Sequence, residues 1–173
     1  MLISESMTAA LNRQIGNEFQ TSMQYTAIAA WFAAETLPEL SKRFTLQAGE
    51  ERDHAAKIVD YIVDAGGKIE IPGLDAPKCA FESAEEAVAL ALESEYEVTR
   101  QINELMDLAI RESDHQAQNF LQWFVAEQRE EVALMDALLN MIRRAGESGL
   151  LFVEEYLARN GVQAGASGAA PTA

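Results

Sequence analysis

The stretch Glu50-Glu51-Arg52-Asp53-His54 decides how the rest of this chain is interpreted. It lies within a segment of helical hydrophobic periodicity that runs from about residue 38 to residue 65. Residues three apart share one face of an α-helix, so Glu51 and His54 can bind one cation between them. Alone, such a pair is typical of a solvated helix face. However, Glu51 falls in the apolar stripe of its helix, where an unpaired carboxylate is costly, so the remaining helices are expected to supply its partners.

Length and composition favour a single all-α domain. The chain has 173 residues, enough for one sizeable core, and 49% of them are hydrophobic, which argues against disorder. The 10 glycines and 4 prolines cluster in a few places. Between them lie long runs rich in Ala, Leu, Glu and Gln, which favour helix formation.

Charge and cysteine content restrict the partners and the compartment. The formal net charge of -15 disfavours nucleic acid or an anionic membrane as partner, and it either attracts cations or simply keeps the protein soluble. The single cysteine, Cys79, excludes an internal disulfide and favours a reducing compartment. We find no secretory signal pattern and no apolar run of the ~18 residues that a membrane span needs. We therefore expect a cytoplasmic protein with no membrane partner.

Periodicity and end signals predict five helices. They cover about residues 6–35, 38–65, 83–112, 115–145 and 150–159. The connection at Pro38 is short, so the first two helices should form an antiparallel hairpin. Helical periodicity is lost between residues 68 and 82, and a connection of that length is expected to cross over the fold. The third helix should then run parallel to the second.

These elements predict a four-helix bundle, made of two antiparallel hairpins joined by a long crossover, plus a short fifth C-terminal helix. The bundle domain is assigned to residues 1–160. The Ala/Gly-rich segment 161–173 has no apolar pattern, so a disordered tail is expected there.

Each of the four long helices places a carboxylate in its apolar stripe, at mid-length. The four are Glu18, Glu51, Glu95 and Glu131. Oxygen-rich donors with one imidazole suit iron or manganese, whereas a closed zinc site prefers thiolates and imidazoles. Two divalent ions would also neutralise the four negative charges. The alternative, four unrelated buried acids, requires four separate desolvation costs in one layer.

With these motifs in place, the chain resembles the ferritin family over about residues 6–160. The resemblance is carried by Asn17-Glu18 with Tyr25 seven residues later, Glu50-Glu51-x-x-His54-Ala55, Glu95, and Phe120-Leu121-Gln122-Trp123-Phe124-Val125-Ala126-Glu127-Gln128-x-x-Glu131. The pattern is most similar to that of the bacterial non-haem ferritins. The expected fold is then a ferritin-like four-helix bundle.

This resemblance implies an activity and a ligand set. It implies a hollow 24-subunit homo-oligomer that oxidises Fe(II) with O2 or peroxide at a ferroxidase centre and stores the ferric mineral. It also implies that Glu18, Glu51 and His54 bind a first iron, and that Glu51 bridges to a second. The second iron would be held by Glu95, with Gln128 and Glu131 alongside.

A third iron position of many prokaryotic ferritins is matched by four acids. They are Glu50, Glu127, Glu130 and Glu131. From the residues alone, this set equally fits a solvated helix face. Tyr25 is open to two interpretations: it either donates an electron or a hydrogen bond at the site, or it is an ordinary core tyrosine.

The chain departs from related families at several positions. Arg52 stands where bacterioferritins have a haem-ligating methionine, so no haem is expected, and the Cys-x-x-Cys iron domain of rubrerythrins is absent from the sequence. Gln118 and Leu121 occupy the stretch where animal ferritins have channel acids, which leaves the route of iron entry open.

Two other functions fit the same sequence. One is a ferritin-like dimetal protein that detoxifies peroxide without storing iron. The other is a structural helical bundle whose buried acids only fix the register of the helices.

Overall fold

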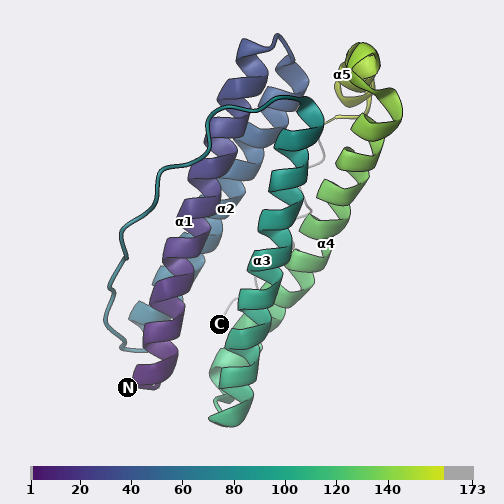
Figure 1. The fold of residues 1–173 in the computed structure, drawn as a ribbon. Helices are drawn as coiled ribbons and strands as arrows, with labels where there is room; N and C mark the ends of the chain where they lie inside the picture. The colour runs from purple at the N-terminus through teal and green to yellow at the C-terminus, as the bar shows by residue number, and fades with distance from the viewer. Residues whose placement is uncertain (1, 162–173) are drawn as a thin grey trace.

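The structure is a computed structural model that describes residues 2–161. Its α-helices are α1 (Glu5–Ala34), α2 (Pro38–Asp64), α3 (Ala84–Arg111), α4 (His115–Ala145) and α5 (Leu150–Asn160), with a short 3-10 turn at Glu147–Gly149 before α5 (Figure 1). The predicted helix bounds are confirmed to within one or two residues. Residues 162–173 of the predicted tail lie outside the described residues.

Side chains and backbone geometry define the helix ends. Ser4 accepts a hydrogen bond from the amide of Met7 at 3.0 Å, and Ser83 accepts one from Glu86 at 3.1 Å. Asp114 caps α4 in the same way, since its carboxylate accepts from two amides of the first turn. At the other end of α4, Gly146 has φ 64°, a conformation that glycine adopts without strain.

The crossover between α2 and α3 climbs the full length of the bundle beside α1 (Figure 1). As a result α3 runs parallel to α2, as the length of the connection predicted. Three amide side chains of α1 hold this segment against the helix, because each donates to a backbone C=O of the crossover and accepts from a backbone N–H. The pairs are Asn12 with Lys68 and Glu70, Gln20 with Asp75, and Gln24 with Lys78.

A glycine completes the stripe of α1 that faces the crossover. Gly16 lies midway between Asn12 and Gln20, on the same helix face. A Cβ atom at Gly16 would stand 2.3 Å from Cγ of Pro72, so only glycine permits the crossover to lie this close to α1.

The core consists of two apolar clusters, one in each half of the bundle. The first cluster includes Phe32, Phe44 and Leu138 and continues into α5. The second includes Leu11, Ile58 and Phe124. Between them, at mid-length of the four long helices, lies a layer of buried polar side chains.

The fifth helix closes one end of the bundle, where it packs against α2 and α4 (Figure 1). Its Glu154 accepts hydrogen bonds from the amides of Glu39 and Leu40, at 2.7 and 2.9 Å. A carboxylate is favourable at this position, because the first amides of a helix carry partial positive charge. None of the helices in residues 2–161 is long and apolar enough to cross a membrane.

Candidate metal centre

The polar layer brings together one or two side chains from each long helix. Its members are Glu18 of α1, Glu51 and His54 of α2, Glu95 of α3, and Gln128 and Glu131 of α4. All six are at most 3% exposed. The helical stripe that predicted their burial is therefore confirmed, and they lie at one level between the two apolar clusters.

Glu18, Glu51 and His54 form the tightest part of the layer. Within the described residues they are the one group of three such side chains whose ligand atoms all lie within 4.8 Å of one another. The Nδ1 atom of His54 is 3.2 Å from Oε2 of Glu51 and 3.9 Å from Oε2 of Glu18. Two carboxylates and an imidazole at this spacing can share one cation.

Hydrogen bonds from neighbouring side chains hold the other half of the layer. Glu95 accepts from the hydroxyl of Tyr25 and from Nε2 of Gln128, the latter at 3.0 Å. Oε2 of Glu131 accepts from Nε2 of Gln47 at 2.8 Å. Tyr25 is thus fully buried and also bonded to a carboxylate of the site, which fits a hydrogen-bond role there.

Several carboxylate oxygens in the layer have no hydrogen-bond partner among the described residues. They are Oε2 of Glu18, Oε1 of Glu51 and Oε1 of Glu131, joined by Oε2 of Glu50 at the edge. A buried carboxylate oxygen without a donor is unfavourable, and a bound cation removes that cost. The donor set therefore fits divalent ions that prefer oxygen and imidazole ligands, such as iron.

Burial and mutual repulsion make these carboxylates hard to ionise. Burial, followed by the charge of Glu51, raises the pKa of Glu18 well above its ordinary value. Burial and the charge of Glu95 do the same for the pKa of Glu51, and burial raises the pKa of Glu95 itself. The pKa of Glu131 rises to about 7, chiefly through burial and then through the charges of Glu95 and Glu50.

Of the four acids predicted to form a third iron position, Glu131 belongs to the layer and the other three do not. Glu127 is buried, Glu50 is half-buried and Glu130 is exposed, with its carboxylate 3.7 Å from Arg129. Burial raises the pKa of both Glu50 and Glu127. In residues 2–161 these acids do not form a second three-residue group as tight as that of Glu18, so the third position stays a prediction.

Three residues at the site were not predicted from the sequence. Gln14 donates to Oε1 of Glu18 at 2.8 Å, and Gln47 bonds Glu131 across the bundle. Arg43 is only 4% exposed; burial lowers the pKa of its guanidinium, while the charges of Glu131 and Glu50 oppose that change. Gln14 precedes Glu18 by four residues and Gln47 precedes Glu51 by four, a spacing that places each amide one turn before a carboxylate.

Arg52, Gln118 and Leu121, which depart from related families, are not part of the layer. Arg52 is exposed, and its Nη1 lies 3.4 Å from Oγ of Ser22. Leu121 is buried in the second apolar cluster, and the half-buried Gln118 donates to the carbonyl of Ala109 at 3.2 Å.

Known proteins are similar to this chain over most of its length. The ferritin-like domain family matches residues 8–145. Ferritin BfrB of Mycolicibacterium smegmatis is 46% identical over 166 residues, covering 95% of this chain and 91% of the relative. A bacterial non-heme ferritin of Staphylococcus aureus is 36% identical over 155 residues, covering 89% and 93%. Among solved structures, an open pore ferritin from the archaeon Archaeoglobus fulgidus has a TM-score of 0.88 at 36% identity, covering 91% of this chain and 97% of that chain. On its fold, its polar layer and these matches, the chain belongs to the ferritin family.

Proposed function

We propose that this protein stores iron and that its polar layer is a ferroxidase centre, which oxidises Fe(II) to Fe(III). The observation that carries the proposal is the buried donor set: carboxylates from all four long helices meet one imidazole, and several of their oxygens lack a hydrogen-bond partner among the described residues. The relatives are themselves named as ferritins, which supports iron as the substrate.

The likeness to the ferritins suggests a role for each side chain of the layer. Glu18, Glu51 and His54, whose ligand atoms lie closest together, bind the first Fe(II). Glu51 bridges to a second Fe(II) that is held by Glu95. Gln128 and Glu131 lie alongside this second ion and complete the centre.

The reaction withdraws one electron from each of two Fe(II) ions. With two protons, these electrons reduce O2 to hydrogen peroxide, or reduce hydrogen peroxide to two molecules of water. The carboxylates favour the product state, because Coulomb attraction to a trivalent ion exceeds that to a divalent one, and more so in a poorly solvated layer. Tyr25 either orients Glu95 through its hydroxyl or supplies a further electron.

The wider proposal concerns assembly and surroundings. We infer a shell of 24 subunits that encloses the ferric mineral, with a third iron at Glu50, Glu127, Glu130 and Glu131. The protein acts in the cytoplasm and binds neither haem nor nucleic acid. The high negative charge favours the approach of Fe(II) over that of anionic partners.

Two measurements on the full chain test the proposal. Size-exclusion chromatography should show an assembly of about 24 subunits, and Fe(II) added in air should produce the absorbance of Fe(III) together with retained iron. A small assembly that still oxidises Fe(II) would favour peroxide detoxification without storage. No iron-dependent absorbance at all would leave the layer as a structural device that fixes helix register.

A further inference from the structure

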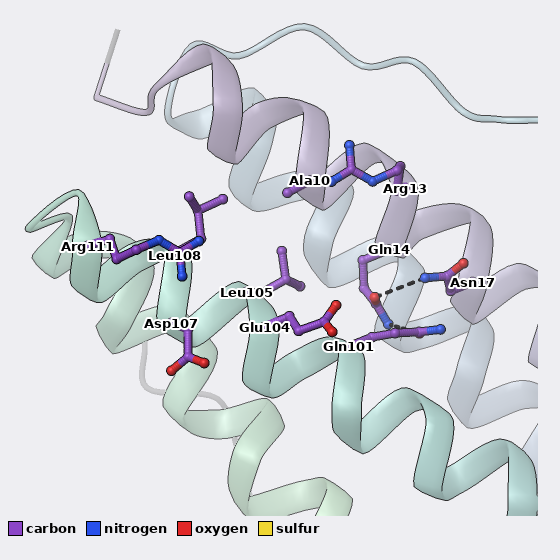
Figure 2. A pocket seen from close by; sticks show the side chains of 10 residues that line it. All are labelled: Ala10, Arg13, Gln14, Asn17, Gln101, Glu104, Leu105, Asp107, Leu108 and Arg111. Carbon is purple, nitrogen blue, oxygen red and sulfur yellow. Dashed lines mark hydrogen bonds between the residues drawn. The ribbon is translucent and has the colours of Figure 1, made fainter.

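A hollow of about 340 Å³ opens between α1 and α3 (Figure 2). Arg13, Asn17, Gln101 and Glu104 are among the side chains that line it. Gln14 also lines it but is only 2% exposed, so it forms part of the hollow's floor. The same Gln14 touches Glu18 on its inner side, and this connects the hollow to the metal centre.

Three hydrogen bonds fix the orientation of the Gln14 amide. Its Nε2 atom donates to Oε1 of Glu18 at 2.8 Å and to Oε1 of Gln101 at 3.3 Å. Its carbonyl oxygen accepts from Nδ2 of Asn17 at 3.1 Å (Figure 2 shows the bonds to Asn17 and Gln101). A glutamine amide has two N–H donors and one carbonyl, so all its groups are used. Rotating the amide by half a turn would set its carbonyl against the carboxylate of Glu18.

This amide also determines which oxygen of Glu18 is free. Oε1 is occupied by Gln14, whereas Oε2 has no hydrogen-bond partner in residues 2–161 and lies 3.9 Å from Nδ1 of His54. The terminal torsion of a glutamate is soft and roughly two-fold, so the carboxylate does not hold one orientation by itself. The bond from Gln14 supplies the restraint.

We infer that Gln14 is a positioning residue of the metal centre, which anchors one oxygen of Glu18 and thereby directs the other toward the cation shared with Glu51 and His54. The inference rests on the proposed function, because it assigns Glu18 to a metal. Partners that hydrogen-bond a ligating side chain typically change metal affinity ten- to a hundredfold when they are removed. Gln14 is expected to act at the lower end of that range, since Glu18 keeps its place on the helix.

The test is a titration of the iron-free, assembled protein with Co(II), followed by the visible absorption of the bound ion. Gln14→Met keeps the length of the side chain and removes both donors. It should weaken Co(II) binding at the centre about tenfold and change the visible spectrum of the bound ion. Asn17→Ala frees the Gln14 carbonyl without touching Glu18, so it should weaken binding in the same direction by a smaller factor.

A matched control lies on the same helix. Gln24→Met removes two hydrogen bonds to the crossover and leaves the polar layer alone, so its Co(II) affinity and spectrum should equal those of wild type. Size-exclusion chromatography and circular dichroism establish that each variant is assembled and helical. If Gln14→Met does not fold, the Asn17→Ala titration decides the question.

Glu18→Ala separates failure of this inference from failure of the proposed function. Suppose that Glu18→Ala loses Co(II) binding, while Gln14→Met and Asn17→Ala both bind Co(II) within twofold of the wild-type affinity. This result overturns the positioning role of Gln14 and still supports the metal centre. Wild-type Co(II) binding in Glu18→Ala itself overturns both.

Discussion

Phe44, Glu51 and Ile58 follow one another on α2 at intervals of about two turns, and all three are at most 1% exposed, yet their surroundings differ in kind. Phe44 packs in the first apolar cluster, with its ring centroid 5.6 Å from those of Tyr25 and Phe32, and Ile58 packs in the second. Glu51 has an oxygen with no hydrogen-bond partner in the described part of the chain, and burial raises its pKa. The apolar clusters are therefore completed by the chain itself, whereas the polar layer keeps carboxylate oxygens whose partner, under the proposed function, is a bound cation.

This comparison predicts that the two regions respond to mutation in opposite ways. Removing a side chain from the polar layer should lower the rate of Fe(II) oxidation and leave the fold intact. Removing one from an apolar cluster should cost stability by the same amount with and without metal. Four experiments examine this contrast, from the largest expected effect to the smallest.

The largest effect is expected from the tight group of the layer. Glu18→Ala, Glu51→Ala and His54→Ala should each lower the rate of the fast phase of Fe(II) oxidation by more than about a hundredfold, because each deletes a proposed ligand rather than a neighbour of one. The shell should still assemble, since none of these side chains is exposed. Stopped-flow absorbance and size-exclusion chromatography measure the two properties, and wild-type rates in all three variants would remove the site assignment.

The apolar counterpart is Ile62→Ala in the second cluster. Ile62 is fully buried, so its truncation should destabilise the protein by about 2–5 kcal/mol. The thermal midpoint should fall by roughly 10 °C, equally with chelator and with added divalent ion. Ile62→Val is the control, with an expected loss of about 0.5–1.5 kcal/mol. A loss that disappears when metal is added would show that the cluster and the polar layer are not independent.

The sequence predicted the fold almost completely, because each helix carries its own periodicity and end signals. The apolar stripe placed Glu18, Glu51, Glu95 and Glu131 in one layer, since helices of similar length and short hairpin connections bring their midpoints to one level.

On α3 the spacing of three and four residues predicts a buried stripe at two positions that are not buried; its members are Val88, Leu92, Glu95, Thr99, Ile102, Met106 and Ala109. Thr99 and Met106 are half-buried, whereas Val98 and Leu105, one position earlier, are buried. The misplacement does not grow along the helix, because Ile102 and Ala109, which belong to the same predicted stripe, are buried.

The contacts between side chains of different helices could not be predicted. Gln47 bonds Glu131 on α4 rather than Glu51 on its own helix, and only the relative rotation of α2 and α4 decides between the two. Likewise, Asn12 and Gln20 pin a crossover that has no periodicity to place it beside α1. Such contacts depend on how two segments pack against each other. The residue pattern within one helix carries no information about that packing.

A smaller effect is expected from the acids at the edge of the layer. Changing Glu127 and Glu130 together to Ala should spare the initial fast oxidation, because neither belongs to the tight group around Glu51. The number of Fe(II) oxidised per O2, or the rate of later turnovers, should change by a few-fold if these acids bind a third iron. Oxygen-electrode measurements over repeated Fe(II) additions test this. An unchanged ratio and unchanged turnover would assign the pair to a solvated helix face.

The smallest effect is expected from the electrostatics of the layer without metal. Burial and the charges of Glu95 and Glu50 raise the pKa of Glu131 from its ordinary 4.5 to about 7. A raised carboxylate pKa means that the folded state favours the protonated form. The stabilising contribution is therefore complete below about pH 4.5 and is lost as the pH rises to about 7. Chelated wild-type protein should become less stable across this interval.

Glu131→Gln removes that dependence while keeping the shape of the side chain. In chelated protein, the thermal midpoint of Glu131→Gln relative to wild type should rise between pH 5 and pH 7.5, by an amount that corresponds to on the order of 1–2 kcal/mol. The midpoints are compared at one fixed scan rate, because a shell can unfold irreversibly. Glu147→Gln, which removes an exposed carboxylate far from the layer, should leave the pH dependence of wild type unchanged.

Added divalent ion should then stabilise wild type more than Glu131→Gln, because binding to the folded state adds stability by mass action and the variant has lost an ionisable donor. If the difference between the two chelated proteins does not change with pH, and divalent ion raises both midpoints equally, Glu131 does not share the charge of a buried metal centre.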